Sequence, residues 1–162
     1  MFDNQTEKFI DILGSVAETM ITNNYADHIY TLSKGISWIT FQNECAAIRI
    51  DDQLCKQGKG ITLYSSFKQN LKGDKIYTVF EDSEGDEWIL TNKGISIIGK
   101  KQVDSDFPFQ YIKEADGIIY LVSQSDKLAS YNFKTRQFKF IEIPYHVSVS
   151  YTHLTLPTIC SV

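Results

Sequence analysis

The sequence contains little of what several classes of binding and catalytic site require. Only two of its 16 basic residues are arginines, Arg49 and Arg136, so clamps that hold an anion between paired guanidinium groups are not expected. The formal net charge of −4 argues against a nucleic-acid-binding surface, which needs clustered Lys and Arg. The three cysteines, Cys45, Cys55 and Cys160, are odd in number and lack metal-ligand spacing. The sequence therefore supports neither a zinc site nor a disulfide framework.

Long hydrophobic runs are also missing. No window approaches the ~18 uncharged apolar residues that would cross a bilayer. Residues 1–5 lead into ordinary polar sequence, without the charged-then-apolar start of a secretory leader. We expect a soluble chain that makes no contact with a membrane.

No sequence pattern indicates a catalytic centre. Ser, Cys and His do not occur in an arrangement typical of a nucleophile and its base. The acidic pairs Asp51-Asp52 and Asp104/Asp106 lie close together in expected turns, whereas glycoside hydrolysis needs two carboxylates on either side of a cleft. The sequence predicts no catalytic residue, no cofactor and no metal site, and it does not identify the ligand-binding residues.

What the sequence does contain is aromatic residues, at 13%, and an internal repeat. A turn glycine is followed three residues later by an aromatic, then by an aliphatic run and Ser or Thr. This pattern starts at Gly35 with Trp38, at Gly85 with Trp88 and at Gly117 with Tyr120. Repetition of one supersecondary unit indicates a fold in which neighbouring units bury each other's apolar faces.

The flanking sequence gives the period of the repeat. Residues 27–32 resemble residues 74–79, and residues 2–12 resemble residues 131–141, which begin 129 positions later. Three repeats in 129 residues average 43, a length that fits four short strands and their turns, as in one propeller blade. We predict an all-β fold, a partial β-propeller of about three four-stranded antiparallel blades at 13–52, 53–100 and 101–143. Residues 1–12 would form the last strand of a preceding blade.

The turns and aromatics have structural roles in this fold. Asn92-Lys93-Gly94 indicates a hairpin in which Gly94 supplies a positive φ. Trp38, Trp88 and Tyr120 could stack on sugars, but their common place in the repeat favours blade-core anchors. Burying each one would be worth about 2–4 kcal/mol.

The acidic segment 81–87 has two interpretations. It carries five carboxylates in seven residues, which could suggest calcium. It lacks the alternating ligands and the distal Glu of an EF-hand loop, so a solvated hairpin turn is favoured.

Residues 81–96 resemble the two-component regulator propeller repeat, which reads loosely as acidic-Asp-x-x-Gly-x-x-Trp-Ile-x-Thr-x-x-Gly-Leu. The resemblance is specific around Trp88, moderate around Trp38 and weak around Tyr120, and the repeats together cover about residues 1–143. It implies a sensor region of a hybrid two-component histidine kinase, in the periplasm and ahead of a membrane helix, that binds glycans or other small ligands. The partners implied are the remaining blades of a parent protein that forms a homodimer.

The kinase region is absent from this sequence, so the expected function is a non-catalytic binding module. Two alternatives remain. The chain could belong to a propeller lyase or hydrolase whose catalytic residues lie in other blades, or to a propeller scaffold that only binds proteins.

The last residues do not continue the repeat. Residues 149–158, Val-Ser-Tyr-Thr-His-Leu-Thr-Leu-Pro-Thr, resemble the translation of a transposase-type sequencing-library adapter. We interpret residues 149–162 as an artefactual tail, in which His153 and Cys160 carry no function. On this interpretation the natural protein continues past Ser148.

Overall fold

The structure is a computed structural model that describes residues 2–3, 8–9, 25–42, 47–57, 59–64, 71–125 and 127–142. The described part is almost entirely β-structure: besides the strands it contains one 3₁₀ turn, η1 (Ser33–Gly35), and one short helix, α2 (Asp52–Cys55). The predicted all-β class is confirmed. Residues 13–24 and the tail at 149–162 lie outside the described residues. No helix in the described part is both long and apolar enough to cross a membrane.

The first sheet has four antiparallel strands in the order β3-β4-β5-β6. They are β3 (Ala26–Thr31), β4 (Ile36–Phe41), β5 (Ala47–Asp51) and β6 (Ile61–Tyr64). Asp51 ends β5, and its carboxylate caps α2 by accepting from the N–H groups of Gln53 and Leu54, each at 3.1 Å. The Asp51 N–H donates to the Gly60 carbonyl at 2.7 Å, which returns the chain to pair as β6. The first sheet thus continues past the predicted boundary at residue 53.

The second sheet has three strands among the described residues, in the order β7-β8-β9. They are β7 (Ile76–Glu81), β8 (Glu87–Thr91) and β9 (Gly94–Ile98). The prediction of four strands in this unit is wrong for the described chain, because the strand at 61–64 pairs with β5. The predicted hairpin at Asn92-Lys93 is present, and Gly94 has a φ of 134°. A Cβ on Gly94 would lie 2.2 Å from the Ser105 carbonyl oxygen, so only glycine fits.

The third sheet is a four-stranded meander, β10-β11-β12-β13. Its strands are β10 (Tyr111–Ala115), β11 (Ile118–Val122), β12 (Leu128–Asn132) and β13 (Gln137–Ile141). A separate hairpin of β1 (Phe2–Asp3) and β2 (Lys8–Phe9) pairs Phe2 with Phe9, as β12 and β13 pair Tyr131 with Phe138. Residues 2–3 and 8–9 therefore form two short paired strands, where a single strand was predicted for residues 1–12.

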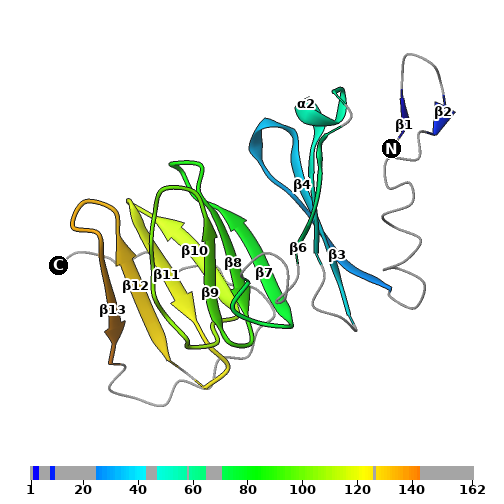
Figure 1. Cartoon of the computed structure of the whole chain (residues 1–162). Coiled ribbons are helices and arrows are strands. Elements are labelled where there is room, and N and C mark those ends of the chain that lie inside the picture. The colour runs from blue at the N-terminus through cyan, green and yellow to red at the C-terminus, as the bar shows by residue number, and fades with distance from the viewer. Residues whose placement is uncertain are drawn as a thin grey trace.

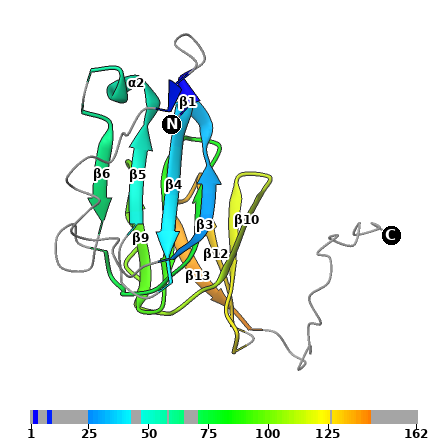
Figure 2. The same cartoon turned by 90° about the vertical axis from the view of Figure 1, so that its right-hand side faces the viewer.

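The three sheets are stacked face to face along the chain (Figure 1). Viewed along the stack, β6 lies at one edge of the first sheet and β3 at the other, and β10 lies on the side of β3 (Figure 2). The first strands β7 and β10 come within 8 Å of each other. Two apolar cores fill the gaps between the sheets, one around Trp38 and one around Trp88. The described sheets do not close into a ring.

The first and second sheets each turn a repeat aromatic toward the sheet that follows. Trp38 is packed in a core with Val79 and Ile89 of the second sheet. Trp88 is packed in a core with Ile119 and Leu121 of the third. The hydrophobic effect between successive repeats is therefore what builds the stack.

Candidate functional site

The first junction, between the first and second sheets, holds a buried ion pair around Trp38. The indole Nε1 of Trp38 donates to Oε2 of Glu87 at 2.7 Å. Arg49, which pairs with Trp38 across β4 and β5, donates from Nη2 to Oε1 of Glu87 at 2.7 Å and from Nε to both oxygens. Trp38 is 0% exposed and Glu87 4%. The hydrogen bonds to Glu87 raise the pKa of Arg49 above its ordinary value, so the guanidinium stays charged.

At the second junction, between the second and third sheets, the buried indole N–H of the tryptophan finds its acceptor within its own hairpin. Nε1 of Trp88 donates to Oδ2 of Asp82 at 2.7 Å, and Asp82 belongs to the hairpin that joins β7 to β8. Lys101 places its Nζ 2.8 Å from Asp82, 3.2 Å from Asp86 and 2.6 Å from Glu84. The ammonium also lies 4.3 Å from the centre of the Phe133 ring in the third sheet.

The acidic hairpin is therefore not the solvated turn that the sequence favoured. Three of its five carboxylates, those of Asp82, Asp86 and Glu87, are each 4% exposed by residue. Their charge is balanced by two basic residues that lie outside the segment, Lys101 and Arg49. The position that a metal ion would need among these carboxylates is occupied by the Lys101 ammonium. The part of the chain that the structure describes contains no other group of acidic, His or Cys side chains placed to hold a metal.

Electrostatics at this hairpin favour the charged forms. Burial by itself would raise the pKa of Asp86, but hydrogen bonds from the backbone N–H of Lys100 and from Lys101 hold that pKa below its ordinary value. Burial would likewise lower the pKa of Lys101, yet its bonds to three carboxylates, Asp82 first, raise it well above the ordinary value.

Serine–carboxylate contacts join the hairpin of one sheet to the first strand of the next. The N–H and Oγ of Ser33 donate to the two oxygens of Glu81, each at 2.5 Å. Ser83 repeats this arrangement with Glu114: its N–H donates at 2.7 Å and its Oγ donates to the other oxygen. The corresponding residue of the third hairpin is Ala115, the last residue of β10, which has no hydroxyl to donate.

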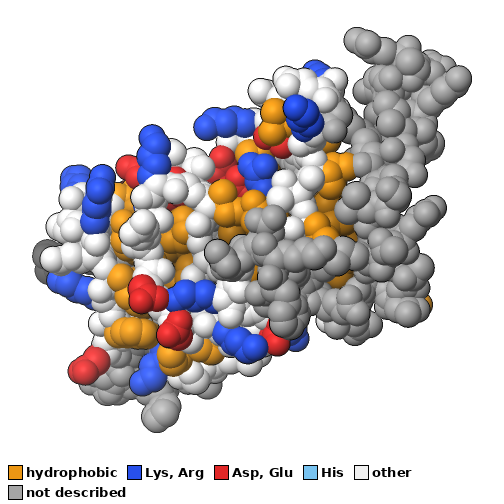
Figure 3. All heavy atoms as spheres, in the orientation of Figure 1, with side chains coloured by type: hydrophobic (Ala, Val, Ile, Leu, Met, Phe, Trp, Pro, Cys, Tyr) orange, Lys and Arg blue, Asp and Glu red, His pale blue; other side chains and the backbone are white. Residues whose placement is uncertain are grey.

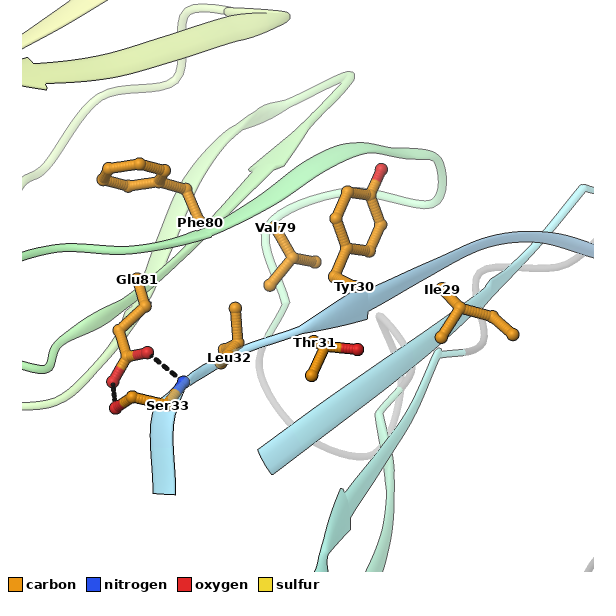
Figure 4. A pocket seen from close by; sticks show the side chains of 8 residues that line it. All are labelled: Ile29, Tyr30, Thr31, Leu32, Ser33, Val79, Phe80 and Glu81. Carbon is orange, nitrogen blue, oxygen red and sulfur yellow. Dashed lines mark hydrogen bonds between the residues drawn. The ribbon is translucent and has the colours of Figure 1, made fainter. Parts of the chain in front are cut away.

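A hollow of about 470 Å³ lies between the first strands β3 and β7. Figure 4 shows Glu81 and Ser33, with their two hydrogen bonds, toward one end and Ile29 toward the other. Tyr30, Leu32, Val79 and Phe80 lie between them. Polar and apolar side chains both line the hollow, and the Ser33–Glu81 contact lies at its hairpin end.

A second hollow, of about 440 Å³, lies at the hairpins and shares Ser33 and Glu81 with the first. Its other lining residues are Lys34, Asp82, Ser83, Glu84, Gly85 and Glu114. The carboxylates of Glu81 and Glu114 are taken up by serines. Lys34 has no ion-pair partner among the described residues, and its Nζ lies 3.4 Å from where a Cβ on Gly85 would be. The cation at this edge is thus the group available to an incoming ligand.

His28 is the only histidine among the described residues. Its Nδ1 lies 3.3 Å from the carboxylate of Asp27, and its ring stacks on that of Tyr30 with 6.0 Å between the ring centres. A hydrogen bond from Gln42 lowers the pKa of Asp27. On the face shown in Figure 3, basic and acidic side chains are interspersed over the sheets. The charged and polar contacts of this region join neighbouring sheets, and two open hollows lie beside them.

The structure places the repeat positions that the sequence singled out in two groups. The glycines at the hairpins have similar left-handed conformations, with φ values of 75° at Gly35, 85° at Gly85 and 72° at Gly117. Trp38 and Trp88 are each 0% exposed. Tyr120 occupies the same repeat position but is only half-buried, because no described sheet follows the third one.

Sequence reasoning missed the polar partners of the tryptophans. Glu87 directly precedes Trp88, and the residues that precede the other two aromatics are Ser37 and Ile119. The cross-strand partners of the three aromatics on the third strand are Arg49, Ile97 and Ser130. The residues at these two positions match across each junction. At the first junction the basic Arg49 pairs with the acidic Glu87, and at the second the apolar Ile97 packs in the core that contains Ile119. This match could be used only once the strand register was known.

The comparisons with known proteins are consistent with this architecture. No protein-family model and no curated protein sequence matches the chain. The chain is similar to the crystal structure of the extracellular domain of a putative one-component system from B. thetaiotaomicron, with a TM-score of 0.52 and 15% sequence identity. The match covers 73% of this chain and 17% of that one. At this identity the likeness shows the fold alone, and the chain spans only a small part of that neighbour.

Proposed function

We propose that this chain is part of a ligand-sensing β-propeller, in the periplasmic sensor region of a hybrid two-component histidine kinase. The observation that carries the proposal is the stacking of successive sheets, with Trp38 and Trp88 each turned toward the next sheet. A propeller is built by that operation repeated about one axis. The similarity to the extracellular domain of a putative one-component system supports the same class of protein.

The proposed role is binding, without catalysis or a cofactor. The buried carboxylates at the junctions already accept hydrogen bonds from Trp, Arg and Lys side chains, so these groups serve to hold the sheets together. The remaining blades of a dimeric parent protein would be the main partners. A glycan or another small polar ligand would bind above the hairpins, where function resides in loops carried by a rigid scaffold.

Within the described residues we assign one contact to that ligand. Lys34 stands at the edge of the hollow at the hairpins, with a φ of 58° that fixes its direction, and it offers a donor without an ion-pair partner. The walls supply the Ser33 and Ser83 hydroxyls. An anionic or hydroxyl-rich sugar matches this set of groups.

The decisive experiment is to read the gene beyond the Ser148 codon in an intact copy. Further repeats, a membrane helix and a histidine-kinase sequence would establish the sensor. A stop codon after about seven blades in total, without a membrane helix, would overturn it.

Ligand binding is tested on the intact sensor region by thermal shift against neutral and anionic oligosaccharides. Lys34→Ala should weaken binding of the sugar that responds, while Lys134→Ala, at the β12–β13 turn, should leave it unchanged. Equal binding by both variants would remove Lys34 from the site.

A further inference from the structure

The third sheet presents a face that none of the described sheets covers. One row across this face consists of Lys113, Tyr120, Ser130 and Lys139, which are cross-strand neighbours in register. The next row consists of Tyr111, Val122, Leu128 and Ile141. These rows lie opposite the side occupied by Ile119, Leu121, Ala129 and Tyr131, which are buried against the second sheet.

The same row exists in the first sheet, where its function is visible. There it consists of Tyr30, Trp38, Arg49 and Thr62. It receives Glu87, the residue that precedes the repeat aromatic of the following sheet. The row of the second sheet contains Phe80, Trp88 and Ile97, and the corresponding residue of the third sheet is the apolar Ile119.

The two junctions therefore follow one rule: a basic residue in the row is met by an acid, and an apolar row is met by an aliphatic residue. The row on the uncovered face carries two lysines, Lys113 and Lys139, both exposed. Neither ammonium has an ion-pair partner among the described residues. If this row were covered by an aliphatic residue, two charges would be buried without a partner, which is strongly unfavourable.

We propose that the uncovered face of β10–β13 docks a further antiparallel sheet of the same repeat, one that carries Asp or Glu directly before its repeat aromatic. That carboxylate lies over Tyr120 and is held by Lys113 and Lys139, as Glu87 is held by Trp38 and Arg49. The apolar row of Val122, Leu128 and Ile141 supplies the packing area beside it. This inference rests on the proposed function, because it requires the repeats to continue, and it specifies the chemistry of the next one.

The first test is again the intact gene, and its outcomes separate the two proposals. A following repeat with Asp or Glu directly before its aromatic supports the docking chemistry. A following repeat with an apolar or basic residue there overturns it, while the sensor proposal stands. A chain with no following repeat overturns both.

The second test uses the intact sensor region and zero-length carbodiimide cross-linking of amines to carboxylates. We expect Lys113 or Lys139 to be cross-linked to the acid of the following sheet, identified by mass spectrometry. Combined reversal, Lys113→Glu with Lys139→Glu, should raise the rate of proteolysis at this junction about tenfold, because like charges meet there. Changing the acid of the following sheet to Lys in that background should restore the original rate.

Lys134→Glu, on the β12–β13 turn outside the row, is the matched control and should change neither readout. Cross-linking of the two lysines to a second copy of the chain, with no contact to a following sheet, would overturn the proposal in favour of self-association. An unchanged proteolysis rate in the doubly reversed variant would overturn it as well.

Discussion

At the first junction Trp38 donates its indole N–H to Glu87 of the following sheet, whereas at the second junction Trp88 donates to Asp82 of its own hairpin. The two tryptophans hold the same place in the repeat and are equally buried. The difference arises because the following sheet offers Glu87 at the first junction and Ile119 at the second. An indole N–H that is buried needs an acceptor, and the hairpin supplies one where the neighbour does not.

At both junctions the buried indole N–H has a carboxylate acceptor, but the acceptor comes from the following sheet at the first junction and from the same hairpin at the second. One junction is held across sheets by a charged pair, and its strength depends on Arg49 and Glu87 together. The other is apolar across the sheets, and its charges are gathered around Lys101 beside the hairpin. Mutations should affect the two junctions differently. The largest losses in the free energy of unfolding are expected where packing and a hydrogen bond to a buried charge are removed together.

Removing either buried indole should cause the largest loss. We expect Trp88→Ala and Trp38→Ala each to lower the free energy of unfolding by about 3–5 kcal/mol, because a large cavity opens and a buried carboxylate loses a donor. The effect is measured by urea denaturation followed by far-ultraviolet circular dichroism. A loss below ~1 kcal/mol for either variant would show that packing around that tryptophan contributes little to the stability of the folded chain.

The ion pair of the first junction can be replaced by apolar side chains. Arg49→Ile alone should cost about 3–5 kcal/mol, because the buried Glu87 charge loses its partner. The double variant Arg49→Ile with Glu87→Ile removes both charges but leaves the buried indole N–H of Trp38 without its acceptor, so it should recover only part of that loss. A double-mutant cycle in urea provides the measurement. Simple additivity of the two single losses would show that Arg49 and Glu87 do not act as a pair.

The charge cluster of the second junction should respond to both mutation and pH. Lys101→Met should cost about 2–4 kcal/mol, because Asp82 and Asp86 remain buried with less compensation. The lowered pKa of Asp86 contributes stability that is present above its unfolded-state pKa and is lost as the pH falls through the lower, folded-state value.

Stability of the unmodified protein should therefore be level near neutrality and fall below about pH 4. In Lys101→Met the acid-induced fall should be smaller and should end at a higher pH, because without the ammonium the folded-state pKa of Asp86 lies closer to its unfolded-state value. Urea denaturation at a series of pH values from about 3 to 8 measures the free energy of unfolding of both proteins across the range in which carboxyl groups titrate. Parallel curves for the two proteins would disconnect Lys101 from the acid response.

The serine–carboxylate contacts should contribute less to stability than the buried ion pairs, and similar amounts at the two junctions. Ser33→Ala and Ser83→Ala should each cost about 1 kcal/mol, because one hydroxyl donor to a carboxylate is lost while the backbone N–H donor remains. Thermal unfolding of the two variants measures the losses. A loss several times larger at one serine would show that the two contacts are not equivalent.

The smallest effect is expected at the third repeat aromatic. Tyr120→Ala in this chain should change the free energy of unfolding by about 1 kcal/mol or less, because its ring is only half-buried on the uncovered face. In an intact protein with a covering sheet, the same variant should approach the losses seen at Trp38 and Trp88. Equal losses in the two settings would mean that no sheet covers this face.

Several features of the fold followed from the sequence because they are local. The alternation of apolar residues, the glycine turns and the Asn92-Lys93-Gly94 hairpin each depend on a few neighbouring residues, and the structure has these elements where they were expected. The membership of β6 in the first sheet was missed, because the pairing of β6 with β5 depends on a return loop closed by Asp51 and Gly60. A period in the sequence does not reveal where one sheet ends.

By itself the sequence determined the repeated unit, its all-β character and the common place of Trp38, Trp88 and Tyr120, since periodicity records which residues face a core. Only the tertiary structure decided how the charges are used. Arg49 and Glu87 are 38 positions apart, and Lys101 reaches back to Asp82 over 19 positions, so no local pattern could pair them. Burial turned an apparently solvated acidic turn into the polar framework of two junctions, because charges taken out of water must find partners.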